Sequence, residues 1–108
     1  MRFMLLKFAH AADVGALPDA QALTAVEDFN QALRRAGVLL AHDQLLPPTA
    51  AAGSPAVSGA NTTGVLTAYW LIQARSGDEA VAWARRCPVT APGLIDIRQV
   101  LPSDQATR

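Results

Sequence analysis

The chain has 108 residues, which is enough for one domain with a single hydrophobic core. Hydrophobic residues make up 51% and charged residues 17%, against about 25% charged residues in an average soluble domain. Basic and acidic residues balance at nine each, which argues against nucleic acid or a membrane surface as a partner.

The N-terminal segment MRFMLLKF, residues 1–8, predicts a strand that is covered on both faces, because apolar side chains occupy both parities. Its apolar run is interrupted by Lys7 and is too short for a signal peptide or a membrane span. We therefore expect a cytoplasmic protein. A lysine inside an apolar strand needs a carboxylate partner, such as Asp43 or Asp96, or reaches solvent with its flexible stem.

A helix is predicted over residues 19–37. Apolar positions recur in it at helical spacing: Leu23, Val26, Phe29 or Asn30, and Leu33. Arg34, Arg35 and Gly37 suit its end, because cations oppose the helix dipole and glycine permits a left-handed turn.

A second strand is predicted over residues 38–46, VLLAHDQLL, and ends at Pro47. Residues 47–64 are rich in small residues, proline and glycine, so we expect a flexible connection there, with a short strand over 56–58 as an alternative. The strongest strand signal follows over residues 65–74, VLTAYWLIQA, which are rich in aromatic and branched side chains.

The remaining segments complete one domain over residues 1–101. Ser76 and Glu79 form the S-x-x-E pattern of a capping box, which predicts a helix over residues 76–87. A last strand follows over residues 93–101, and residues 102–108 are predicted to be a frayed tail.

This order of elements predicts a ferredoxin-like βαββαβ sandwich of the α+β class, with an antiparallel sheet. Two helices cover only one face of such a sheet. The other face is apolar whichever set of alternate strand residues points to it, because the third strand offers either Tyr69 and Leu71 or Trp70 and Ile72. We therefore expect a second copy to pack against it as a homodimer.

Several segments together resemble the YCII-related family, in the branch named for its Asp-Gly-Pro-Phe motif. They are MRFMLLKF, LRRAGVLLAHDQLLPPT, LTAYWLIQA, and DEAVAWARRCP with IDIRQV, and they span residues 2–101. The resemblance implies a ferredoxin-like fold that pairs into a dimeric α+β barrel, with clefts for small molecules. The Asp-Gly-Pro-Phe motif is absent, and residues 49–64 contain no acidic residue, so its carboxylate has no counterpart here.

The neighbours His42 and Asp43 suggest a catalytic pair, which needs two side chains that converge on one substrate atom. Successive side chains on a strand point to opposite faces, so the two do not converge unless a bulge redirects one of them. His42 alone is a candidate for proton transfer. The alternative is a structural histidine bonded to a backbone carbonyl.

Five further residues are candidates for a site. His10 and Asp13 follow the first strand, where a loop permits convergence; the alternative is a solvated loop with a local turn at Asp13. Tyr69 and Trp70 are candidates to stack on a ligand, with the core or a dimer interface as the alternative. Lys7 is a further candidate for ligand binding.

Cys87 is the only cysteine, which excludes an internal disulfide and a metal site built from several cysteines. Arg85 and Arg86 beside it favour a reactive thiolate, whereas a small apolar residue that packs a helix end is the simpler interpretation. The sequence has no phosphate-binding glycine loop, zinc-ligand spacing or nucleophilic serine motif. We predict no metal and no cofactor.

These features support three hypotheses about function. The first is a small homodimer that binds a small organic molecule in a cleft beside the sheet, contacted by Lys7, Tyr69 and Trp70. The second is a cofactor-independent isomerase or lyase in which His10, with Asp13, or His42 transfers a proton. The third is a protein-interaction or regulatory module. A cavity lined by Tyr69, Trp70 or the first strand would favour the first.

Overall fold

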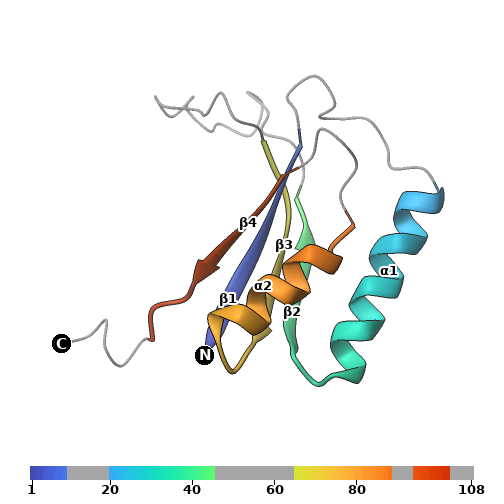
Figure 1. The fold of residues 1–108 in the computed structure, drawn as a ribbon. Coiled ribbons are helices and arrows are strands. Elements are labelled where there is room, and N and C mark those ends of the chain that lie inside the picture. Colours follow the sequence, from blue (N-terminus) through green and yellow to red (C-terminus); the bar gives the residue numbers. More distant parts are fainter. Residues whose placement is uncertain (10–19, 46–64, 89–93, 103–108) are drawn as a thin grey trace, which may run out of the picture.

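The computed structural model describes residues 1–9, 20–45, 65–88 and 94–102. In chain order the elements are β1 (Arg2–Ala9), α1 (Ala20–Arg35), β2 (Leu39–Gln44), β3 (Val65–Gln73), α2 (Gly77–Arg86) and β4 (Leu94–Gln99) (Figure 1). The four strands form one antiparallel sheet in the order β2-β3-β1-β4. This topology confirms the predicted ferredoxin-like fold. The whole of the predicted 47–64 connection, with its optional strand, and the tail beyond residue 102 lie outside the described residues.

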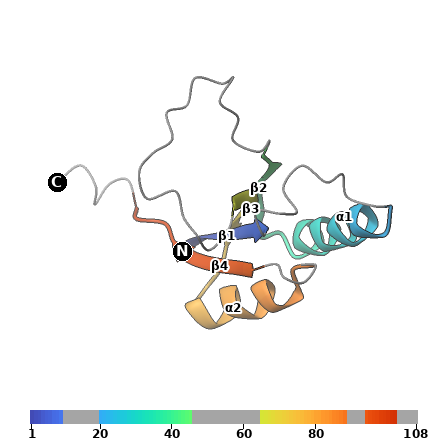
Figure 2. The same ribbon diagram turned by 90° about the horizontal axis from the view of Figure 1, so that it is seen from above.

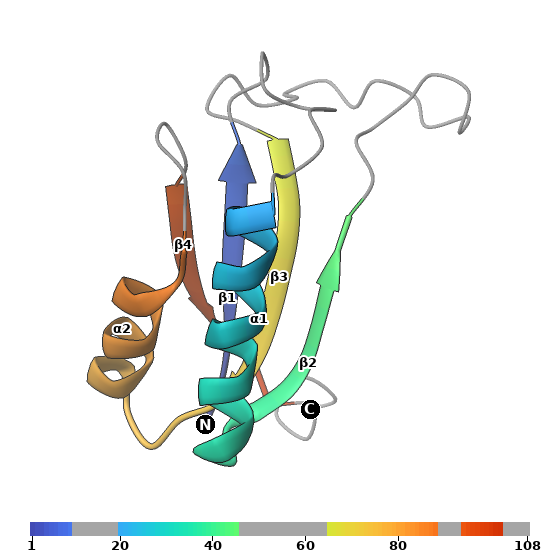
Figure 3. The ribbon, with the colours of Figure 1, turned by 90° about the vertical axis from the view of Figure 1, so that its right-hand side faces the viewer.

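Both helices lie on the same side of the sheet (Figure 3). Seen from above, α1 lies on the β2 side and α2 on the β4 side (Figure 2), in agreement with the contacts of α1 with β2 and of α2 with β4. One face of the sheet is therefore covered, and we call the other the open face. No helix in the described part of the chain is long and apolar enough to cross a membrane.

The end of α1 follows from Gly37, as the sequence predicts. Gly37 has φ of 72°, a left-handed conformation that glycine adopts without a steric penalty. Its N–H donates to the carbonyl of Arg34 at 2.9 Å, and the N–H of Val38 donates to the carbonyl of Leu33 at 3.0 Å. These two bonds satisfy carbonyls at the helix end and turn the chain into β2.

The start of α2 follows from Ser76, which caps the helix by accepting a hydrogen bond from the backbone N–H of Glu79 at 3.1 Å. The return bond differs from the predicted capping box. The Glu79 carboxylate accepts from the backbone N–H of Arg75 at 3.0 Å, one residue before the cap. The side chains of both Ser76 and Glu79 accept a backbone hydrogen bond at the helix start, so the helix begins where the sequence predicts.

The core lies between the helices and the sheet. Leu5, Leu33, Trp70 and Ile72 are its largest fully buried side chains. Asn30, only 4% exposed, is the one buried polar residue among those described. Leu23 was expected in the apolar stripe of α1 but is 48% exposed, because the buried positions of α1, Phe29, Asn30 and Leu33, lie in the second half of the helix.

Two register shifts interrupt the sheet close to the candidate residues. Between β2 and β3, Leu39 pairs with Ile72 but Ala41 pairs with Leu71, so Leu40 is an extra residue. Between β1 and β3 the pairing shifts after Lys7, and Thr67 is the extra residue. The Thr67 hydroxyl donates to the carbonyl of Lys7 at 3.3 Å, which anchors the second bulge. Bulges of this kind change the face toward which the following side chains point.

Candidate functional site

The candidate site lies at the end of the sheet where β1 and β2 finish and β3 begins. Ala9 pairs with Val65, and Gln44 pairs with Ala68, so these strand ends lie side by side. The sequence predicted that the end of the first strand neighbours the start of the third, and the register confirms it. His10 and Asp13 follow this end of β1 in sequence but lie outside the described residues.

His42 lies on the helix-facing side of β2 and is half-buried. Its ring stacks on Trp70, with the ring centroids 4.6 Å apart and an interplanar angle of 16°. Nδ1 lies 2.9 Å from the carbonyl oxygen of Tyr69. A carbonyl oxygen only accepts, so Nδ1 is the donor in this bond. The carbonyl bond expected of a structural histidine is present, and within the described residues Nε2 has no hydrogen-bond partner.

Trp70 supports His42 from the core. It is fully buried, and its Nε1–H donates to Oδ1 of Asn30 at 2.6 Å. Phe29 meets it edge to face, with the ring centroids 5.5 Å apart. With His42 on its face, Trp70 has no open surface for a ligand unless His42 moves. Asn30 was treated only as a helix position in the sequence, and no sequence signal connects it with Trp70, which is 40 residues away.

Asp43 lies on the open face, opposite Tyr69 in the register. The Tyr69 hydroxyl donates to Oδ2 of Asp43 at 2.5 Å. This bond, with burial and the negative charge of Asp43 as smaller causes, raises the pKa of Tyr69 above 10.0. His42 and Asp43 therefore point to opposite faces, as strand geometry predicts, and they do not form a dyad.

The Tyr69–Asp43 bond predicts a measurable pH dependence. Tyr69 is the only tyrosine, so its ionisation can be followed alone by ultraviolet absorbance. We expect its titration midpoint above 10.0, because the phenolate would face a carboxylate. The stabilising effect of the bond should be complete below pH 10.0, the ordinary pKa of a tyrosine, and should disappear as the pH rises past the raised pKa of Tyr69.

The matched variants for this titration are Asp43→Ala and Asp96→Ala, which remove carboxylates from the same face. Asp43→Ala should lower the Tyr69 midpoint, and Asp96→Ala should leave it in place. An unchanged midpoint in Asp43→Ala would contradict the hydrogen bond.

Lys7 lies on the helix-facing side, opposite Ala68 in β3 and Ile95 in β4. The predicted pairing with Asp43 or Asp96 is wrong, because both carboxylates lie on the open face. Within the described ranges, Lys7 makes no ion pair. Its ammonium is thus a charge at this end of the sheet with no carboxylate bound to it there.

Cys87 lies at the end of α2 and is 5% exposed. Burial raises the pKa of its thiol from 9.0 to about 12, and the nearby positive charge of Lys7 opposes this rise only in part. The thiol is therefore protonated at neutral pH, and the activation that Arg85 and Arg86 suggested does not occur. Cys87 packs the helix end as a small apolar residue.

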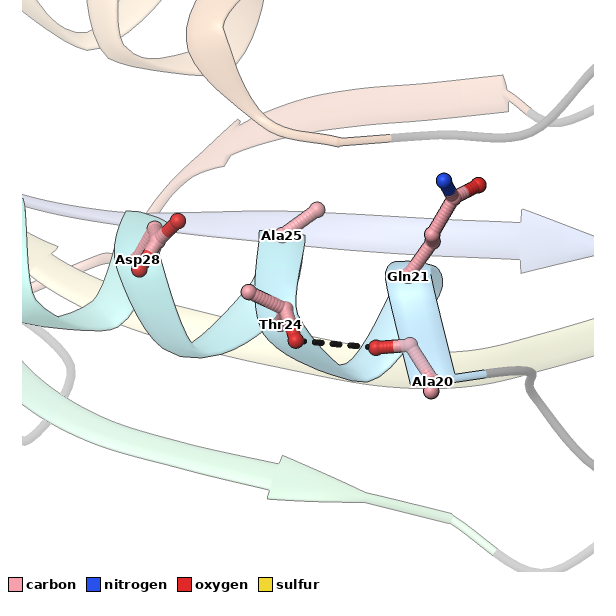
Figure 4. Close-up of a pocket in the computed structure, with 5 residues that line it drawn as sticks. All are labelled: Ala20, Gln21, Thr24, Ala25 and Asp28. Atoms are coloured by element: carbon pink, nitrogen blue, oxygen red, sulfur yellow. Dashed lines mark hydrogen bonds between the residues drawn. The ribbon is translucent and has the colours of Figure 1, made fainter.

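Two hollows on the described surface lie away from these residues. One is a shallow depression on α1, lined by Ala20, Gln21, Thr24, Ala25 and Asp28, where the Thr24 hydroxyl donates to the carbonyl of Ala20 (Figure 4). The other is a groove of about 340 Å³ between α1 and the end of α2, with Phe29 and Arg86 in its lining. Neither of these two hollows includes Tyr69, Trp70 or His42, so neither is the predicted cavity.

No group of three histidine, cysteine, aspartate or glutamate side chains in the described ranges is arranged to hold a metal ion. The titratable groups described at the sheet end include one imidazole, one ammonium, and a phenol bonded to a carboxylate. Such a set can bind an organic molecule through hydrogen bonds and charge.

Comparison with known proteins identifies the family. Residues 1–104 match the model of the YCII-related domain. The chain belongs to the YCII-related family. The resemblance that the sequence segments suggested is therefore confirmed, even though the Asp-Gly-Pro-Phe motif is missing. No curated protein matches this YCII-related chain significantly.

A solved structure has a similar fold. It is the 5-chloro-2-hydroxyhydroquinone dehydrochlorinase from Burkholderia phenoliruptrix AC1100, in complex with 2,5-dihydroxybenzoquinone. The match has a TM-score of 0.53 and 12% sequence identity, and it covers 96% of this YCII-related chain and 98% of that chain. At this identity the similarity establishes a shared fold over nearly the whole length of both chains.

Proposed function

We propose that this YCII-related chain works as a homodimer that binds a small organic molecule at the end of the sheet described above. Lys7 and His42 would contact the molecule from the helix-facing side, and Tyr69 from the open side. Trp70 would act by holding the His42 ring. The dehydrochlorinase of similar fold is in complex with 2,5-dihydroxybenzoquinone, which makes a small ring compound with hydroxyl and carbonyl oxygens the first class to test.

The observation that carries this proposal is the hydrogen bonding and the fixed orientation of the His42 ring. The Tyr69 carbonyl holds the proton on Nδ1 and Trp70 holds the plane of the ring. In the described part of the chain, Nε2 has no hydrogen-bond partner. A half-buried acceptor with a fixed orientation suits a ligand hydroxyl, and the Lys7 ammonium suits an anionic oxygen.

The homodimer is supported by the open face. Met4, Leu6 and Leu71 lie on it in the two central strands, beside Tyr69, and neither described helix covers them. They are half-buried in one chain, and a second copy would bury the remainder of this apolar stripe. A second copy would also add walls to a site that one chain leaves open.

The fixed tautomer of His42 also favours a second candidate, a cofactor-independent isomerase or lyase. In that case Nε2 would accept a proton from the bound molecule. The described residues supply no carboxylate partner for His42, because Asp43 lies on the opposite face. His10 and Asp13 remain the candidates for a second proton-transfer group.

A titration with 2,5-dihydroxybenzoquinone, monitored by nuclear magnetic resonance, tests the proposal. We expect saturable shifts of the His42 imidazole signals, identified by their loss in His42→Phe. That variant keeps a flat ring against Trp70 but lacks Nε2. Its affinity should fall about tenfold, the effect of losing a hydrogen bond of about 1.4 kcal/mol.

The control is Thr24→Ala in the α1 depression (Figure 4), which should bind the compound as the natural chain does. Natural affinity in His42→Phe, or shifts confined to the residues of that depression, would contradict the proposed site.

A further inference from the structure

A groove of about 340 Å³ lies between α1 and the end of α2, on the side of the sheet that both helices cover (Figure 3). One wall is a stripe of α1 residues spaced at i, i+3, i+4 and i+7: Ala25, Asp28, Phe29 and Ala32. The other wall is formed by Arg86 and Pro88. Phe29 is 5% exposed and gives the groove an apolar floor, and the small alanines leave room beside it. The volume is near the lower limit of ligand pockets, which span about 300–1,000 Å³, so it suits a small molecule.

Arg86 is oriented at this groove by an aromatic ring. Its guanidinium lies over the ring of Trp83, 4.5 Å from the ring centroid. Trp83 in turn meets Phe29 edge to face, with the ring centroids 6.4 Å apart. Stacking occupies the flat face of the guanidinium and leaves the N–H groups at its edge able to bind a carboxylate with two parallel hydrogen bonds. Among the residues that the structure describes, no carboxylate pairs with Arg86.

Asp28 supplies the opposite charge from the α1 wall. Its side chain is exposed, and within the described ranges its carboxylate forms no ion pair. Although Asp28 and Arg86 line the same groove, they do not pair with each other. The groove therefore offers an unpaired acceptor on one wall and unpaired donors on the other, over a shared apolar floor.

The charges on the two walls define the class of ligand. One acid and one base cancel, so the groove is complemented by a molecule that carries one cation and one anion and has no net charge. A carboxylate matches the planar Arg86 guanidinium, and an ammonium group matches the Asp28 carboxylate. A phosphate is a poorer anion here, because it would bring up to about two negative charges toward Asp28. A ring between the two charged groups would pack on Phe29.

We propose that this groove binds a small zwitterion. Arg86 binds the carboxylate of the molecule, Asp28 binds its ammonium group, and Phe29 contacts the apolar body between them. The lining of the groove contains no residue of the site at the end of the sheet. The zwitterion site is therefore a second binding site, and it does not depend on the ligand or the homodimer of the proposed function.

A titration with 4-(aminomethyl)benzoate, a zwitterion with a flat ring, tests the proposal at low salt. The reporter is the indole N–H signal of Trp83 in nuclear magnetic resonance, identified by its loss in Trp83→Phe. The chain has two tryptophans, and the other, Trp70, is fully buried. We expect saturable shifts of the Trp83 signal. The singly charged compounds 4-methylbenzoate and 4-methylbenzylamine should bind at least about tenfold more weakly, because each lacks one charge-assisted hydrogen bond.

Charge-removing variants test the two residues. Arg86→Gln and Asp28→Asn should each weaken the binding of 4-(aminomethyl)benzoate about tenfold. The matched controls Arg85→Gln and Asp78→Asn remove the same charges from exposed positions outside the groove and should bind it as the natural chain does. Circular dichroism checks that every variant is folded. The proposal is overturned if no saturable shift occurs, if the singly charged compounds bind equally well, or if the groove variants and the controls behave alike.

Discussion

Leu71→Glu is expected to give a folded monomer. Leu71 lies at the centre of the open face, between Met4 in β1 and Ala41 in β2. In the proposed dimer, the variant would bury an unpaired carboxylate in each chain, at a cost of about 3–5 kcal/mol. Because the dimer would bury two such carboxylates, its dissociation constant should rise by at least about a thousandfold. Sedimentation velocity measures the association, and circular dichroism checks the fold.

Leu23→Glu is the matched control for this substitution. Leu23 is 48% exposed on α1, on the helix side of the molecule, so the same change there should leave the dimer intact. A dimer that survives Leu71→Glu would show that the open face is not the interface. A monomer in the natural chain would contradict the paired-sheet argument altogether.

The second large effect is expected in the core beneath His42. Asn30→Leu removes the acceptor of the Trp70 indole N–H and leaves that donor buried without a partner. We expect the free energy of unfolding to fall by about 1–3 kcal/mol, the cost of an unsatisfied buried polar group. Trp70→Phe leaves the Asn30 carboxamide unpaired in the same way. Urea unfolding followed by circular dichroism measures both.

The double variant separates the contribution of the Asn30–Trp70 hydrogen bond to stability from that of side-chain packing. Because Asn30→Leu and Trp70→Phe remove the two partners of one bond, the double variant should lose less than the sum of the single effects, by about 1–2 kcal/mol. Thr24→Ala, at an exposed site on the same helix, should change the stability by less than about 0.5 kcal/mol. Strict additivity in the double variant would show that the 2.6 Å contact does not couple the two residues.

Local signals in the sequence predicted the helix boundaries well, because each signal acts through nearby backbone groups. Gly37 ends α1 with two capping bonds, and Ser76 begins α2 by binding the N–H of Glu79. The position of Leu23 was predicted less well. Helical spacing places it near the apolar stripe, but its burial depends on where the sheet lies under α1, which is a tertiary contact.

Partners that are distant in the chain could not be predicted. The bonds of Trp70 with Asn30 and of His42 with the Tyr69 carbonyl join residues 40 and 27 positions apart. The charge of Lys7 predicted a partner in Asp43 or Asp96, or a side chain that reaches solvent, and the register places both carboxylates on the other face. Charge and hydropathy show that a residue needs a partner, and only the sheet register determines which one is near.

The opposition of His42 and Asp43 was determined by the sequence, because adjacent strand residues point to opposite faces wherever the strand lies. Which face each takes was decided by the tertiary structure. Without the extra residue at Leu40, the pairing of Leu39 with Ile72 would continue and place Asp43 on the helix side. The bulge shifts the register by one residue, so His42 stacks on Trp70 and Asp43 meets Tyr69. Pairing between strands far apart in the chain sets that shift, and no local pattern encodes it.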